Sequence, residues 1–109
     1  MTEVIFLRDD AGLICGFKSE GHTGYGDKGE DIVCAGISAL VINTVNSLER
    51  LTEADLNVTS NEIEGLIECE VTGYRDEDVQ LLLKSLVLGT EGIRKRYGDK
   101  FVRIEKKEV

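Results

Sequence analysis

The sequence is poor in basic residues and in long apolar runs, and each shortage excludes a class of protein. Lys and Arg number 13 against 21 Asp and Glu, which gives a formal net charge of -8. Binding to nucleic acid depends on neutralising phosphates with Lys and Arg, so we expect no direct nucleic-acid partner. The first residues show no basic segment followed by an apolar stretch, and no apolar run approaches the roughly 20 residues that cross a bilayer. We therefore predict a cytoplasmic protein that engages no membrane.

Cysteine is also scarce, with Cys15, Cys34 and Cys69 widely spaced along the chain. The number is odd, and no CxxC pair or flanking histidine pattern accompanies it. A disulfide framework or a zinc site is therefore not expected, and no pattern calls for a metal or cofactor. Cys15 and Cys69 fall on the apolar faces of alternating segments, which predicts two inert core residues.

The length and hydrophobic patterning indicate one small α+β domain. With 109 residues and an apolar share of 41%, the chain can bury a single modest core, so residues 1–109 are treated as one domain. Alternating patterns predict strands at 3–7, 13–19, 56–59, 63–71 and 100–106. Leu13, Cys15 and Phe17 are expected to share one face, and a turn is expected at Ser60-Asn61.

Two helices complete the predicted order ββαββαβ. Residues 31–49 are apolar nearly all round, which is typical of a buried helix. Residues 76–96 repeat apolar positions at helical spacing, with an acidic start and a basic end that complement the helix dipole. We predict two helices packed on a mostly antiparallel sheet.

His22 is the only histidine, and it lies in a glycine-rich segment, residues 21–30, that holds almost no apolar side chain. Such a segment predicts a mobile surface loop. His22 is then either an exposed histidine without a task or a base that titrates near neutral pH.

Cys34 is the candidate partner of His22. If Asp31 caps the helix, Cys34 falls in the first turn, where free N–H groups and the dipole favour a thiolate and could bind an oxyanion. The alternative is that Cys34 is a small buried hydrophobe. The separation of twelve positions along a flexible segment allows His22 to reach Cys34, but it does not require it.

Asp31 and Ser38 could support this pair. Asp31 is favoured as the helix N-cap, and its carboxylate could also hold His22 in one tautomer. Ser38 follows Cys34 by one helical turn. It either lines the site or donates a hydrogen bond to the Cys34 carbonyl, and the second role is the favoured prediction.

These residues form a recognisable pattern: Gly21-His22 before a glycine-rich stretch, then Asp31 to Ser38 as DIVCAGIS. The pattern resembles the ribosomal-processing cysteine protease family (Prp). The resemblance implies a small cytoplasmic homodimer of α+β fold that removes a short N-terminal extension from a large-subunit ribosomal protein. It also implies that Cys34 is the nucleophile, that His22 is the general base and acid, and that Gly21, Asp31 and Ser38 belong to the motif. An apolar, aromatic-containing substrate segment is expected, with no cofactor.

Two other classes of function stay open on the sequence alone. One is a non-catalytic ribosome-associated adaptor, in which Cys34 belongs to the core. The other is a thiol enzyme of a different reaction type, although a single thiol without a resolving neighbour counts against redox chemistry.

Overall fold

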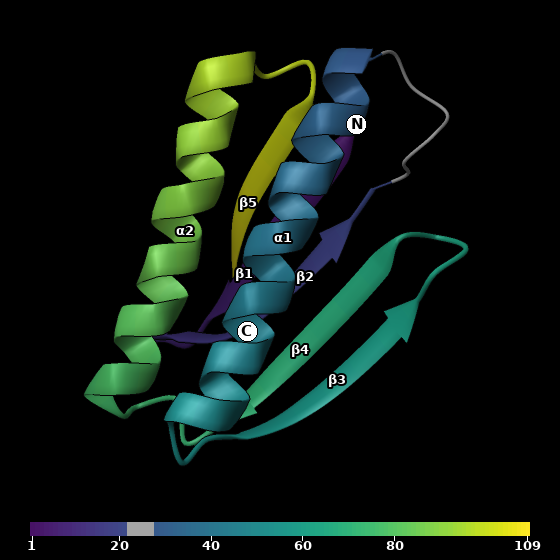
Figure 1. Ribbon diagram of the computed structural model, residues 1–109. Coiled ribbons are helices and arrows are strands. Elements are labelled where there is room, and N and C mark those ends of the chain that lie inside the picture. The colour runs from purple at the N-terminus through teal and green to yellow at the C-terminus, as the bar shows by residue number, and fades with distance from the viewer. Residues whose placement is uncertain (22–27) are drawn as a thin grey trace.

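The protein forms two layers, a five-stranded sheet and a pair of helices that cover one of its faces (Figure 1). The computed structural model describes residues 1–21 and 28–109, and side chains outside residues 22–30. Its elements are β1 (Thr2–Arg8), β2 (Ile14–Glu20), α1 (Lys28–Leu51), β3 (Asp55–Asn61), β4 (Leu66–Thr72), α2 (Glu77–Tyr97) and β5 (Val102–Glu108). The predicted order ββαββαβ is confirmed.

The strands lie in the order β3-β4-β2-β1-β5. Each neighbouring pair is antiparallel except β1 and β5, which run parallel. The sheet is therefore mostly antiparallel, as predicted. The β3–β4 hairpin forms one side of the sheet and extends beyond α1 in Figure 1, so part of it is not covered by the helices.

The core lies between the helices and the sheet. Val4 and Phe6 of β1 are fully buried, as are Ile37 of α1 and Leu83 of α2. Each such side chain contributes about 1.5–3 kcal/mol by leaving water. The helical spacing predicted for α2 is confirmed, because Val79, Leu83 and Leu86 all join this core.

A β-bulge interrupts the predicted alternation of β2. The register passes from Leu7↔Gly16 to Arg8↔Ile14. Cys15 is thus an extra residue, and such an insertion reverses which side chains face the core. Ile14 and Phe17 are buried together, whereas Cys15 is not part of the core cluster. The predicted shared face of Leu13, Cys15 and Phe17 is wrong for this reason.

The turn between β3 and β4 lies at residues 62–65, a few residues later than predicted. Asn61 starts it, since its side-chain oxygen accepts hydrogen bonds from the N–H groups of Ile63 (3.0 Å) and Glu64 (3.2 Å). Gly65 ends it with a φ of +62°, a conformation that favours glycine. Ile63 is 89% exposed in this turn, so the strand predicted at 63–71 begins later than expected, at Leu66.

Helix α1 begins at Lys28, three residues before the predicted start. The rest of the predicted loop, residues 22–27, lies outside the described residues. Over Asp31–Leu51 the helix is long and apolar enough to cross a membrane by length and composition, contrary to the expectation from the sequence. Here it packs against α2 and the sheet. Only part of it is buried, because Ile32 and Ile42 are about half exposed.

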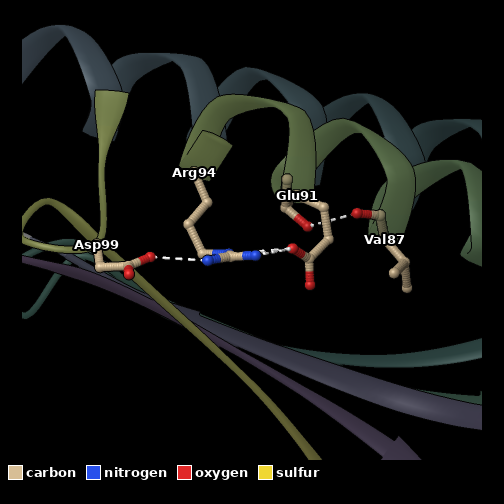
Figure 2. Close-up of polar contacts among 5 residues, drawn as sticks. Val87, Glu91, Arg94 and Asp99 are labelled. Carbon is tan, nitrogen blue, oxygen red and sulfur yellow. Dashed lines mark hydrogen bonds and ion pairs between the residues drawn. The ribbon is translucent and has the colours of Figure 1, made fainter. Parts of the chain in front are cut away.

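Side chains hold both ends of α2. Asp76 is the N-cap and accepts hydrogen bonds from the N–H groups of Asp78 (2.8 Å) and Val79 (3.4 Å). At the other end the Arg94 guanidinium contacts Glu91 (2.8 Å) and Asp99 (2.7 Å), as Figure 2 shows. These contacts tie the helix to the segment that leads into β5, and the acidic start and basic end agree with the prediction.

A further network lies at the end of the sheet where β1 and β2 meet the start of α2. Buried Gln80 accepts a hydrogen bond from the Ile14 N–H (3.1 Å) and donates to the carbonyls of Ile14 (2.8 Å) and Tyr74 (2.6 Å). The Tyr74 hydroxyl donates to Asp9 at 2.9 Å. Three separate segments are thereby fixed to one another.

Candidate active site

The cavity that contains Cys34 lies between α1 and the end of the β3–β4 hairpin, and we call it the Cys34 cavity. Its volume is about 340 Å³. The residues that line it are Gly21, Cys34, Ser38, Ile42, Ser60, Asn61, Glu62, Gly65, Leu66 and Ile67. One wall is helical and the other is the hairpin, so the cavity joins residues that are far apart in the sequence.

Cys34 lies on the second turn of α1 with 2% of its surface exposed. Its thiol lies against the backbone of Gly21, the residue that follows β2. A Cβ at position 21 would approach Cys34 Sγ to 3.2 Å and Thr2 Oγ1 to 2.8 Å. Glycine at position 21 is therefore what allows the chain to pass this close to the thiol. The next residue, His22, lies outside the described residues.

Gly65 of the hairpin turn packs directly on Gly21. The Gly21 N–H donates to the Gly65 carbonyl at 3.2 Å. A Cβ on Gly65 would lie 1.7 Å from the Gly21 carbonyl oxygen. Any residue with a side chain would therefore clash with the backbone at this position. Gly65 was not identified from the sequence. Its place after a turn signal at Asn61 indicates a special backbone angle, but not the contact with a residue in a distant part of the chain.

Ser38 and Ile42 follow Cys34 at intervals of four residues, so all three face the cavity from α1. Among the hydrogen bonds of the described residues, none runs from Ser38 to the Cys34 carbonyl, whereas Thr44 makes the equivalent bond to Leu40. The hydrogen bond favoured for Ser38 is thus not found, and Ser38 lines the cavity instead. The sequence analysis did not identify Ile42 as a cavity residue, because an apolar side chain in an apolar helix is expected to be buried in the core.

Asp31 is not the N-cap of α1. It is the fourth residue of the helix, and Cys34 is the seventh, because the helix begins at Lys28. The backbone N–H of a seventh helical residue belongs to the intrahelical ladder, and the dipole effect is confined to the first turn. The predicted helix-start N–H groups are therefore not beside Cys34, and that part of the expected oxyanion site is wrong.

The other two thiols differ from Cys34 in their surroundings. Cys69 is 1% exposed within the core, and burial, with the nearby charge of Glu70, raises its pKa to about 11. Its prediction as a core residue is confirmed. Cys15 is half-buried at the bulge, where burial and the charge of Asp9 also raise its pKa, so it is not the core residue that was predicted.

The hairpin wall of the cavity combines an acidic and an apolar portion. Glu62 is the charged residue among the described lining residues, and no basic residue accompanies it there. Leu66 and Ile67 supply apolar surface opposite Ile42. The Cys34 thiol thus lies beside a mixed cavity, and the only histidine of the sequence follows Gly21 directly in the chain.

Comparison with known proteins identifies the class more narrowly. The sequence pattern of the cysteine protease Prp family matches residues 1–102, so the chain belongs to that family and is a peptide hydrolase. The resemblance drawn from the Gly21-His22 and DIVCAGIS motifs is confirmed. The adaptor alternative and the other thiol chemistries are not retained.

Relatives and solved structures agree with this assignment. The ribosomal processing cysteine protease Prp of Staphylococcus aureus is 26% identical over 99 residues, which cover 91% of this chain and 93% of that protein. The Prp of Bacillus subtilis is 29% identical over 103 residues, covering 91% and 92%. The S. aureus protease in complex with a substrate peptide superimposes with a TM-score of 0.91 at 25% identity, covering 98% of this chain and 100% of that one. SMU.848 from Streptococcus mutans gives 0.88 at 30%, covering 100% and 99%.

Proposed function

We propose that this chain is a cysteine endopeptidase that removes the short N-terminal extension of a large-subunit ribosomal protein, with residues 1–109 as one protease domain. The observation that carries the proposal is the Cys34 thiol beside a cavity walled by α1 and a hairpin. Membership of the Prp family supports it. The names of the relatives, and the substrate peptide in the S. aureus structure, support the substrate assignment.

In the proposed mechanism Cys34 is the nucleophile and His22 the general base. His22 takes the proton from Sγ, and the thiolate attacks the scissile carbonyl to form a tetrahedral intermediate. Protonated His22 then gives its proton to the leaving amine, and the bond between carbonyl carbon and nitrogen breaks. Water activated by the same histidine hydrolyses the thioester and restores the thiol. The close packing of Gly21 on Cys34 supports the pairing, because it holds the residue before His22 at the thiol.

The cavity walls favour an extended peptide with both apolar and basic residues. Ile42, Leu66 and Ile67 offer surface to the apolar, aromatic-containing segment expected of the substrate. Glu62 offers a carboxylate to a basic side chain, and the net charge of -8 favours a basic ribosomal protein over long distances. Asp31, half-buried on α1 three residues before Cys34, stays a proposed supporting residue.

We also propose a cytoplasmic homodimer that has no direct contact with nucleic acid. The shortage of Lys and Arg supports the last point. Exposed apolar side chains on the helices support association of two copies, since Ile32, Leu81 and Leu88 are between 49% and 76% exposed.

The test is incubation with a ribosomal protein that carries its N-terminal extension. Wild type should release the extension, whereas Cys34→Ala should lower kcat/KM by at least roughly a thousandfold, because no other group replaces the nucleophile. Cys15→Ala, a thiol variant away from the cavity, is the matched control and should keep nearly full activity. His22→Ala should lose activity comparably. Cleavage by Cys34→Ala at the wild-type rate would exclude Cys34 as the nucleophile.

A further inference from the structure

A second cavity, which we call the distal cavity, lies between the sheet and α2 near the Arg8 end of β1. It has a volume of about 200 Å³. Thr2, at the other end of β1, is the residue near Cys34, so about 20 Å of extended strand separates the two cavities. None of the residues that line the distal cavity belongs to the catalytic mechanism.

Three cations line this cavity in a chain of strongly negative charge. Arg8 comes from β1, Lys84 from α2 and Lys106 from β5, and no described lining residue is acidic. Among the described ion pairs, none involves these three side chains, whereas Lys18 pairs with Glu68 (3.6 Å) and Arg103 with Glu3 (3.8 Å) elsewhere. Within the described structure, no carboxylate therefore lies at ion-pair distance from these three cations.

Two of these cations continue the helix-facing sides of their strands. On β1, Val4 and Phe6 face the helices, and alternation places Arg8 on the same side. On β5, the same face carries Val102 and Ile104 before Lys106, which lies opposite Phe6 in the register. Each strand thus carries a basic residue at the next helix-facing position after its core residues. These two positions place positive charge on the side of the sheet that α2 covers.

The rest of the cavity is apolar and firmly held. Half-buried Val87 supplies apolar surface, and the buried side chains of Phe6 and Ile14 form the wall. Buried Gln80 forms part of the wall, and its three hydrogen bonds to Ile14 and Tyr74 use both of its N–H groups. The cations would therefore bind the charged part of a ligand, and the apolar surface would contact its uncharged part. A cavity of roughly 150 Å³ is enough for one benzene ring.

We propose that the distal cavity binds a small organic anion, with a phosphate or carboxylate head held by Arg8, Lys84 and Lys106 and an apolar body of about one ring against Val87. Arg8 can hold two oxygens of such a head at once, and the lysines add point charges. Glu108 is a competing carboxylate, because it lies opposite Arg8 in the strand register.

Phenyl phosphate is the probe, compared with inorganic phosphate as the head alone, phenol as the body alone and benzoate as the carboxylate head. Titrations followed by amide chemical shifts should localise binding to Gly12 and Ile14. Phenyl phosphate or benzoate should bind at least roughly tenfold more tightly than either fragment, because one site takes both parts. Tighter binding of phenyl phosphate would indicate a phosphate ligand, and tighter binding of benzoate would indicate a carboxylate ligand.

Variants separate this site from general surface charge. Lys84→Gln with Lys106→Gln should weaken binding by roughly tenfold, while Glu108→Gln should strengthen it by removing the competing charge. Lys18→Gln, which removes a paired lysine from another part of the sheet, should change nothing, and Cys34→Ala should bind as wild type does. Equal weakening by Lys18→Gln, or shifts that do not centre on the cavity, would overturn the proposal. If the double variant is unfolded, Glu108→Gln alone tests the proposal, and unchanged binding by that variant would contradict it.

Discussion

The two ends of the sheet are held together in different ways. At the Cys34 end, the hairpin turn contacts the end of β2 through two glycines, with a backbone hydrogen bond between Gly21 and Gly65. At the Arg8 end, side chains make the connections, through Gln80, Tyr74 and Asp9. At the Cys34 end, glycines bring two backbone segments close together beside the thiol, whereas at the Arg8 end buried side chains make the connections that fix the fold. The proposed catalytic thiol and this side-chain network therefore lie at opposite ends of one sheet.

The largest expected difference concerns thiol reactivity. The pKa of Cys69 is about 11 against an ordinary value of 9.0, so its thiolate at neutral pH is about 100-fold scarcer than that of an ordinary cysteine. Alkylation by iodoacetamide near pH 7, followed by mass spectrometry of peptides, should modify Cys34 far faster than Cys69 or Cys15. His22→Ala should slow the reaction at Cys34. Equal and slow labelling of all three thiols would contradict the role assigned to Cys34.

Substituting one glycine at each end tests the comparison directly. Gly65→Ala introduces a Cβ that overlaps the Gly21 carbonyl, and Gly73→Ala adds one at a similar positive φ (+77°) with nothing within 4 Å. Both should lose about 1 kcal/mol from the backbone conformation. Only Gly65→Ala should also lower kcat/KM, by at least roughly tenfold, because it separates the hairpin from Gly21. An equal loss of activity in Gly73→Ala would show that stability alone explains the effect.

The Gln80 network should matter for stability and little for chemistry. Gln80→Leu keeps the volume but leaves the N–H and carbonyl of Ile14 and the carbonyl of Tyr74 without their partner. We expect the free energy of unfolding to fall by about 2–3 kcal/mol, measured by urea denaturation. The kcat of the folded fraction should stay near wild type. Ser85→Ala, at an exposed position on the same helix, is the control and should change neither quantity.

The contact between Tyr74 and Asp9 should give a small, pH-dependent effect. Burial opposes ionisation of Asp9, but hydrogen bonds from Leu13, Tyr74 and Ala11 outweigh it and lower the Asp9 pKa. The same contact raises the pKa of Tyr74. Its stabilisation is complete above the unfolded Asp pKa of 3.8 and is lost as the pH falls through the lower folded value.

Tyr74→Phe should therefore reduce stability slightly at pH 7, and the difference from wild type should shrink below pH 3.8. Urea midpoints measured across that range provide the check. On the alkaline side, the contribution of Tyr74 is complete below the unfolded Tyr pKa of 10.0 and is lost as the pH rises through the higher folded value. A constant difference between variant and wild type from neutral to acid pH would show that Asp9 does not take part.

The sequence predicted those features that depend on local patterns. Apolar spacing in α2 and the Asp76 start placed that helix correctly, and alternation located the strands of the sheet. The motif around Cys34 identified the family. Predictions from local patterns were wrong where one residue changes the backbone geometry. At the Cys15 bulge, the extra residue changed which side chains of β2 face the core. The start of α1 was missed because glycine-rich residues before Asp31 do not resemble a helix.

The residues that form the walls of the Cys34 cavity could not be predicted from the sequence, for a different reason. Gly65, Glu62 and Leu66 meet α1 only because β4 pairs with β2, and no local signal encodes that pairing. His22 and its distance from Cys34 remain a prediction from the motif, as residues 22–27 are outside the described structure. The sequence therefore proposed Cys34 as the nucleophile, and the fold shows which residues surround it.

The parallel pairing of β1 with β5 has a consequence for the timing of folding during synthesis. Thr2 pairs with Val102 and also donates its N–H to the Phe101 carbonyl at 2.9 Å, so the first strand waits for nearly the whole chain before it meets this neighbour. Contacts of such long sequence separation form slowly. Thr2 also lies beside Gly21 at the thiol. We therefore expect the nascent chain to complete the surroundings of Cys34 only after β5 has left the ribosome, so that the peptidase stays inactive while the rest of its fold is being synthesised.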